Sequence, residues 1–205
     1  MGKVGEDRRE QIVQAALSAI ATRGVADLRI KDIADAASVS TGTVHYHFTD
    51  VDELLVAIHE MAVDRFVSGR REMLAPIVDA RHKLLALAET GVPASRDDEL
   101  VTALYDLSGL FRRNAIHRTL ARVLYEQQVD LYCLALEVGV AQGHFALGAP
   151  ATDLAANAVA LEDAYGLHIV TGNVSITPDR ARKLLLLHLA EVTHCPRLLT
   201  EGDAS

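Results

Sequence analysis

Apolar side chains recur with the period of an α-helix along nearly the whole chain, and this pattern constrains the fold more than any other feature. Between residues 6 and 23 the apolar set follows the spacing i, i+3, i+4, i+7, i+8, which places side chains on one face of a helix: Ile12, Ala15, Ala16, Ala19 and Ile20. Alanine and leucine are abundant and aromatic residues are few, a balance that favours helices over sheets. We therefore expect an all-α fold of about nine helices with no sheet.

Residues that typically end and begin helices divide this pattern. Gly24 can end the first helix, and Ser40 can cap a short helix by accepting a backbone N–H in its first turn. Asp50, with Glu53 three residues later, is typical of a capping box, and Thr177 followed by a proline predicts the start of the last long helix. The segments for which we expect helices include residues 6–23, 30–37, 41–48, 51–74, 115–142, 153–171 and 178–193.

The polar segment "SVSTGTVHYHFTD" (residues 38–50) is the most distinctive stretch of the chain. On a helical wheel, Val44 and Phe48 share one face, while Gly42 and Tyr46 lie on the opposite face. Glycine costs about 1 kcal/mol in a helix relative to alanine, so its presence on the outer face indicates that something approaches the backbone closely there. A short helix, a tight turn and this second helix together predict a helix-turn-helix that binds DNA. The alternative is a plain surface helix that carries a glycine.

Residues 30–58, "IKDIADAASVSTGTVHYHFTDVDELLVAI", resemble the signature of the TetR/AcrR transcriptional repressors, and the match is dense over residues 8–55. The segment 139–172 is similar, more weakly, to the C-terminal domain of the betaine-pathway repressor subgroup. The resemblance implies a DNA-binding head over residues 1–50 and an effector-binding and dimerisation domain over residues 51–205. The residues we expect to contact DNA are Lys31, Ser40, Thr41, Gly42, Thr43, His45, Tyr46 and His47.

The sequence departs from the family pattern at three positions. Ser38 stands where the family has a turn glycine, so we expect a non-glycine residue near the left-handed region. His45 replaces a tyrosine and Val51 replaces a lysine, and in the family both of those residues tend to contact phosphates. At least one phosphate contact is therefore in doubt, and His45 compensates for it in part at lower pH.

The chain has a net charge of −8, which is unusual for a protein that binds nucleic acid. Residues 1–50 hold six basic and seven acidic residues, whereas residues 51–205 hold 14 basic and 21 acidic residues. The negative charge thus belongs mainly to the expected effector domain. We expect DNA contacts that are weaker and more sensitive to salt than the motif alone implies, placed locally at Lys3, Arg8, Arg9 and Lys31.

Four consecutive leucines, residues 184–187, cover the whole circumference of a helix, so one core-facing stripe cannot bury them all. Residues 153–171 are also apolar on most sides and rich in small side chains. The two segments favour a four-helix dimer interface, which also suits a protein that reads a palindrome. A helix at the centre of a monomer is the alternative.

Polar and aromatic side chains interrupt the apolar faces between residues 105 and 168, where the resemblance implies a small-molecule effector site. The candidate contacts are Tyr105, His117, Tyr125, Glu162, Tyr165 and His168. Ordinary surface groups and satisfied interior groups are the alternative for each of them. Glu162, Asp163 and the tyrosines suit a cationic effector, although a chain without tryptophan is poorly equipped for a quaternary ammonium cage.

Three other functions are alternatives: an enzyme, a metal-sensing repressor and a helical interaction protein. The chain holds no H-E-x-x-H, G-x-S-x-G, C-x-x-C or phosphate-loop motif, so we expect a regulator and not an enzyme, with no cofactor and no metal site. The metal-sensing repressor would use scattered histidines, and the helical interaction protein would have lost DNA binding.

We expect a cytoplasmic protein with reduced cysteines, because the start of the chain lacks the apolar segment of a signal peptide and the two cysteines show no paired spacing.

Overall fold

The computed structural model describes the backbone of residues 2–112 and 114–202 and the side chains of residues 6–112 and 114–200. These residues form ten α-helices and two 3-10 turns, with no strand among them, as the helical periodicity predicts. The chain divides into two compact units. Unit 1 comprises the described residues up to Phe66 together with Asp97–Arg122, and unit 2 comprises Val67–Arg96 and the residues from Val123 onward.

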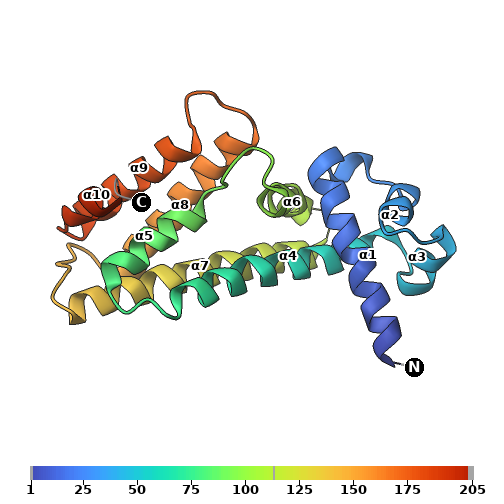
Figure 1. Ribbon diagram of the computed structural model, residues 1–205, viewed down its shortest axis with the longest axis horizontal. Coiled ribbons are helices and arrows are strands. Elements are labelled where there is room, and N and C mark those ends of the chain that lie inside the picture. Colours follow the sequence, from blue (N-terminus) through green and yellow to red (C-terminus); the bar gives the residue numbers. More distant parts are fainter. Residues whose placement is uncertain (1, 113, 203–205) are drawn as a thin grey trace. The chain divides into compact units, whose positions relative to one another are not determined.

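Unit 1 contains the helices expected to form the DNA-binding head. They are α1 (Gly2–Arg23), α2 (Ile30–Ala36) and α3 (Thr41–His47), drawn in blue in Figure 1, where α1 packs against α2 and α2 packs against α3. The first part of α4 (Val51–Leu74), α6 (Glu99–Ser108) and the start of α7 (Ala115–Ala141) complete the unit, and α6 packs against α1. Its core is apolar and comes from every one of the first four helices, with Ile12, Ile20, Ile33, Val44, Phe48 and Leu54 almost fully buried.

Local side-chain chemistry explains where these helices begin and end. The Ser40 hydroxyl accepts a hydrogen bond from the Thr43 N–H at 3.0 Å, so Ser40 caps α3 as expected. Asp50 accepts from the Glu53 N–H at 2.8 Å, and the Glu53 carboxylate reaches back to the N–H of Thr49 at 2.7 Å. The expected capping box at the start of α4 is therefore present, with Thr49 in place of Asp50 as the backbone donor.

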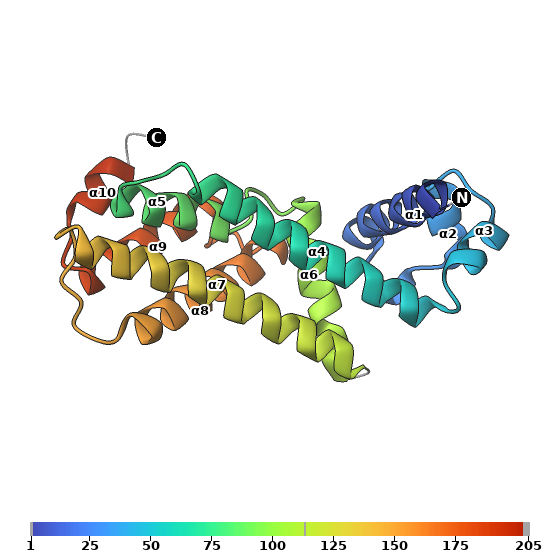
Figure 2. The same ribbon diagram turned by 90° about the horizontal axis from the view of Figure 1, so that it is seen from below.

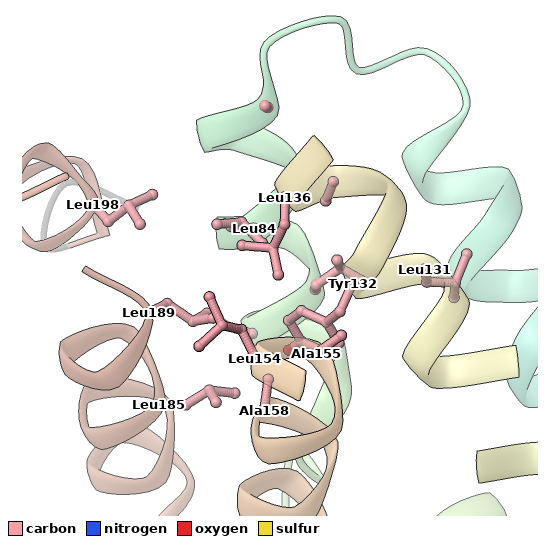
Figure 3. Packing of buried hydrophobic residues seen from close by; sticks show 14 of the residues in the cluster. Leu84, Leu131, Tyr132, Leu136, Leu154, Ala155, Ala158, Leu185, Leu189 and Leu198 are labelled. Atoms are coloured by element: carbon pink, nitrogen blue, oxygen red, sulfur yellow. The ribbon is translucent and has the colours of Figure 1, made fainter. Parts of the chain in front are cut away.

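Unit 2 contains the rest of α4 and α7 together with α5 (Ala80–Gly91), α8 (Ala151–Val170), α9 (Pro178–Val192) and α10 (Arg197–Gly202). Helices α8 and α9 pack against each other, and α5 packs against both of them (Figure 2). Leucine and alanine side chains fill the space between these helices, among them Leu84, Leu136, Leu154, Ala158, Leu185 and Leu189 (Figure 3). The predicted cap of α9 is present, because the Thr177 hydroxyl accepts from the Arg180 N–H.

One element differs from the expectation. The last predicted helix ends near residue 193, but the chain forms a further short helix, α10, directly after Pro196. Leu198 of α10 is fully buried in the core of unit 2, and this burial stabilises a helix too short to show a clear period in the sequence. Both cysteines are free thiols. No helix among the described residues is long and apolar enough to cross a membrane.

The boundary that we expect at residue 50 separates a DNA-binding part of the chain from an effector-binding part. The two units, in contrast, are groups of residues that pack together in space. Helices α4 and α7 each contribute residues to both units. A DNA-binding domain over residues 1–50 and an effector domain over residues 51–205 thus remain a functional prediction.

Candidate DNA-binding helix and interior polar clusters

Helix α3 presents two chemically different faces. Val44 and Phe48 are buried against the other helices of unit 1, which confirms the apolar face expected from the wheel. Gly42, His45 and Tyr46 are exposed on the other side, and the Tyr46 side chain is 84% exposed. The Tyr46 ring contacts the ring of His47 edge-on, with centroids 5.2 Å apart. A large aromatic side chain that is this exposed is available for contact with another molecule.

The remaining predicted DNA contacts lie around this face. Ser40 and Thr41 are exposed at the start of α3, and Lys31 is exposed on α2. The hydroxyls of Ser40 and Thr43 lie 2.9 Å apart and hydrogen-bond to each other, which fixes the first turn of the helix. Thr43 and His47 are half-buried. The structure therefore gathers all eight predicted residues on α2, α3 and the turn that joins them.

Among the described residues, no neighbouring group requires a glycine at position 42. A Cβ added there would meet no described atom closer than the Ser40 hydroxyl at 3.6 Å, which is an ordinary contact, and the residue does not have a positive φ. The chain thus accepts a glycine in a helix, which costs up to about 1 kcal/mol, without an internal packing reason.

Basic side chains flank the same region. The Arg9 guanidinium lies over the Phe48 ring, 4.9 Å from its centroid, which holds Arg9 beside the end of α3. Arg8 donates a hydrogen bond to Gln11, and both Arg8 and Arg9 are exposed. Lys3 lies outside the residues whose side chains are described. Arg23 forms an ion pair with Asp32 at 2.6 Å, so its charge is balanced within the chain.

Two buried histidines form the first interior polar cluster, which lies in unit 1. The Nδ1 atoms of His59 on α4 and His117 on α7 are 2.9 Å apart, and the rings stack with centroids 5.2 Å apart. Burial, and then the proximity of His117, lowers the pKa of His59 to about 4. Burial also lowers the pKa of His117, although Asp52 opposes this effect. Both rings are therefore neutral at pH 7, and one Nδ1–H donates to the other Nδ1.

A buried ion pair forms the second interior cluster, which lies in unit 2. The Arg70 guanidinium on α4 donates to both carboxylate oxygens of Glu162 on α8, at 2.9 and 3.0 Å. Only 3% of the Arg70 side chain and 1% of the Glu162 side chain are exposed. Arg70 also donates to the Gln128 side-chain oxygen at 2.9 Å and to the backbone carbonyl of Leu87 at 3.0 Å.

Tyr132 on α7 completes this cluster. Its hydroxyl donates to Glu162 Oε1 at 2.5 Å, and its ring lies 5.7 Å from the Arg70 guanidinium. Burial, and then the negative charge of Glu162, raises the pKa of the Tyr132 hydroxyl well above its usual value. Burial alone would lower the pKa of Arg70, but Glu162 and Tyr132 raise it above its usual value. Arg70 therefore keeps its positive charge and Tyr132 keeps its proton.

The six expected effector contacts are divided between the two units. Tyr105 and His117 belong to unit 1, where His117 bonds to His59. Tyr125, Glu162, Tyr165 and His168 belong to unit 2. Glu162 bonds to Arg70, Tyr165 packs beside Ile169, and His168 is exposed and bonds to Asn173.

Two residues of the buried clusters, His59 and Arg70, are not among the functional residues predicted from the sequence. Both stand on α4 where an apolar residue is expected, since Arg70 follows Val63 and Val67 at helical spacing and precedes Leu74. A charged or polar residue on an apolar stripe is a signal that could have found them. Among the described residues, no group of three or more His, Cys, Asp or Glu side chains could hold a metal ion.

Comparisons with known proteins relate the chain to bacterial transcriptional regulators. Residues 12–58 match the sequence model of the bacterial regulatory proteins of the tetR family. The chain is 29% identical to the transcriptional repressor KstR2 of Rhodococcus jostii over 146 residues, which cover 70% of each chain. It is 35% identical to the transcriptional regulator BetI of Burkholderia cenocepacia over 106 residues, which cover 50% of this chain and 53% of that one.

A solved structure covers almost the whole chain. It is a transcriptional regulator from Saccharomonospora viridis in complex with choline, with 26% identity and a TM-score of 0.82 over 91% of this chain and 96% of that one. The match to the family reaches from the core of α1 through the helix-turn-helix into α4, and the fold agrees over both units. These relatives are transcriptional regulators, and residues 12–58 of the chain match the helix-turn-helix region of the tetR family of bacterial regulatory proteins.

Proposed function

We propose that the protein is a ligand-responsive repressor that binds a palindromic DNA operator as a dimer and is released by a small-molecule effector. The observation that carries the DNA-reading role is the outer face of α3. Gly42 has no side chain although no packing contact with the described residues requires its absence, and the polar groups of Thr43, His45 and Tyr46 surround it. A backbone that an external surface must approach closely accounts for both features.

In this proposal α3 enters the major groove, where its side chains contact base edges and phosphates. Lys31, Arg8 and Arg9 supply positive charge near this face, although the net charge of the chain is −8. The hydroxyls of Ser40 and Thr41 stand at the start of the helix, where they can bond to phosphate oxygens. His47 is half-buried, so we assign it a supporting contact at the edge of the same face.

Two copies are needed to read a palindrome, and α8 and α9 supply a surface that suits a second copy. On α8 the exposed residues Ala160, Ala164 and Leu167 follow one face, and on α9 Leu187 is exposed beside half-buried Leu184. Leu185 and Leu189 are fully buried on the other side of α9. The leucine run thus has one face in the core of its own subunit and one face available to a partner.

The effector contacts that we propose are those expected from the sequence. Their bonds within the chain and their exposure indicate which of them can touch a ligand directly. Glu162 and His117 are bonded within the chain, so they shape the interior more than they meet a ligand. Tyr105, Tyr125, Tyr165 and His168 are the side chains with exposed or half-buried surface to offer. Action in the cytoplasm, where the chromosome is, is part of the same proposal.

The experiment that tests this function measures binding of the full-length protein to a labelled duplex from the region upstream of its own gene. For about four phosphate contacts in a dimer, raising the salt from roughly 50 to 200 mM should weaken binding about a hundredfold. Binding to unrelated duplexes should be weaker and equally salt-dependent. If upstream and unrelated duplexes bind equally, or if neither binds at low salt, the proposed function is wrong.

A further inference from the structure

The Arg70 guanidinium lies in a site that has the composition of a receptor for an organic cation. We call this site the Arg70 pocket and define it by the Glu162 carboxylate, the Gln128 side-chain oxygen, the Leu87 carbonyl and the Tyr132 ring. A carboxylate, two neutral oxygens and an aromatic face are the groups that bind guanidinium and ammonium ions in proteins. Here the cation is part of the chain itself.

This pocket is closed around its own cation. The side chains of Arg70, Glu162 and Tyr132 are almost fully buried, and Gln128 is buried beside them. The end of α5 seals the side next to Glu162, because a Cβ added at Gly91 would lie only 1.5 Å from Glu162 Oε1. Glycine at this position lets the backbone lie directly against the carboxylate.

The charges within the pocket also oppose a second cation. Both carboxylate oxygens accept from Arg70, and Oε1 accepts from Tyr132 as well. A cationic ligand would have to displace these donors and would meet the positive charge of Arg70 in an interior of low dielectric constant. The carboxylate that the sequence offers to a cationic effector is therefore already neutralised.

We propose that Arg70 is a specificity-determining residue that occupies the cation position of this pocket, so the protein excludes cationic effectors from it. The inference rests on the proposed function, because it concerns the effector that such a regulator recognises. The similar regulator of Saccharomonospora viridis is in complex with choline, a cation, so choline is a suitable probe for this inference. Removing the guanidinium would open a buried space lined by Glu162 and Tyr132 that accepts a small organic cation.

The experiment measures thermal unfolding and heats of binding for the full-length protein with choline and with methylguanidinium. Neither cation, at about 10 mM, should shift the melting temperature of the wild type, since stabilisation requires binding to the folded state. Arg70→Ala should lower the melting temperature by about 10 °C, because it leaves Glu162 buried and unpaired. Methylguanidinium at about ten times its dissociation constant should then restore roughly 3–6 °C.

Three further variants complete the experiment. Arg70→Gln removes the charge but keeps part of the side chain, so it serves if Arg70→Ala does not fold, and it should also gain methylguanidinium binding. The double variant R70A/E162Q lacks the carboxylate and should gain none. Arg182→Ala breaks the partly exposed ion pair between Arg182 and Glu89 and should create no cation site.

Two outcomes would overturn the inference. One is choline binding by the wild type that Glu162→Gln abolishes, and the other is a folded Arg70→Ala or Arg70→Gln variant that binds neither cation. Because the readouts are heat and melting temperature, they do not depend on DNA. A protein that excludes choline but ignores operator DNA would contradict only the proposed function, and an operator-binding protein that binds choline through Glu162 would contradict only this inference.

Discussion

Ser38 stands at a turn position where the family pattern has a glycine. The turn between α2 and α3 places Ser38 at a φ of 54°, which confirms the left-handed conformation expected from the sequence. This conformation costs a non-glycine residue about 1–2 kcal/mol. The Ser38 N–H still bonds to the Asp35 carbonyl at 3.2 Å, so the turn keeps its shape despite the cost.

Replacing Ser38 with glycine should therefore stabilise the protein. We expect the free energy of unfolding to rise by roughly 0.5–1 kcal/mol, because the relief of strain exceeds the entropy that glycine adds to the unfolded chain. Chemical denaturation measures this difference. Ser175→Gly is the control, since Ser175 is exposed and has no positive φ, and it should not stabilise. A loss of stability in Ser38→Gly would show that the left-handed conformation of Ser38 does not strain the backbone.

The two buried histidines make stability depend on pH. The His59 pKa of about 4 in the folded protein lies below the value of about 6.5 in the unfolded chain, so between these values the unfolded state binds more protons. The contribution is fully present above pH 6.5 and is lost as the pH falls toward 4. It amounts to about 2–3 kcal/mol.

Substituting His59 with glutamine should flatten this dependence. Between pH 6.5 and 4 the variant should lose about 2–3 kcal/mol less of its free energy of unfolding than the wild type, as measured by urea denaturation at each pH. Equal slopes for the wild type and His59→Gln would show that the His59–His117 pair does not titrate as its burial implies.

At the scale of elements, the contact between α5 and α8 depends on the last residue of α5. Gly91 is needed because the Glu162 carboxylate occupies the space that a side chain would take. Gly69 on α4 is the opposite case, because a Cβ there would meet nothing within 4 Å. Packing against Glu162 thus requires Gly91, whereas Gly69 only lowers the helix propensity of α4.

We expect Gly91→Ala to destabilise the protein by about 3 kcal/mol, because the added methyl group would push Glu162 away from Arg70. Gly69→Ala should instead stabilise it by up to about 1 kcal/mol through helix propensity alone. Denaturant titrations of both variants give the comparison. If Gly91→Ala were as stable as Gly69→Ala, the backbone of α5 could not lie against the carboxylate as described.

How far the sequence predicts these elements depends on the range of the interactions. The caps at Ser40, Asp50 and Thr177 involve neighbours within four residues, so local chemistry was enough to locate α3, α4 and α9. The buried face of α3 follows from its period. The Arg70–Glu162 pair joins residues 92 positions apart, and His59–His117 joins residues 58 apart, so no local pattern could pair them. Helix α10 was missed because burial of Leu198, rather than a period, holds it.

For the whole molecule, the central expectation is a dimer with two DNA-reading heads. The outer face of α8 carries the small side chains Ala160 and Ala164, and that of α9 carries Leu184 and Leu187, a combination that suits packing between copies. The net charge of −8 arises mainly from residues 51–205, away from the helix-turn-helix in sequence. Association through α8 and α9 would double the few basic contacts that each head offers.

A charge placed on this face should dissociate the dimer. We expect Leu187→Glu to give a monomer in light scattering at micromolar concentration, because a carboxylate pair would be buried at the interface. Operator affinity should fall with it, since each head alone makes about half of the contacts. Val78→Glu, at a similarly exposed apolar position before α5, should leave a dimer. A wild type that is itself monomeric would refute the dimer.

Gly42→Ala tests whether the outer face of α3 meets DNA. Among the described residues the added methyl group would make only an ordinary contact with the Ser40 hydroxyl, so the variant should keep the wild-type melting temperature or exceed it slightly. Its affinity for the upstream duplex, measured by fluorescence anisotropy, should nevertheless fall more than tenfold, because each clash or lost base contact costs about 1–3 kcal/mol. Gly69→Ala should bind like the wild type. A stable Gly42→Ala protein that binds the duplex with wild-type affinity would show that DNA does not approach the α3 backbone at Gly42.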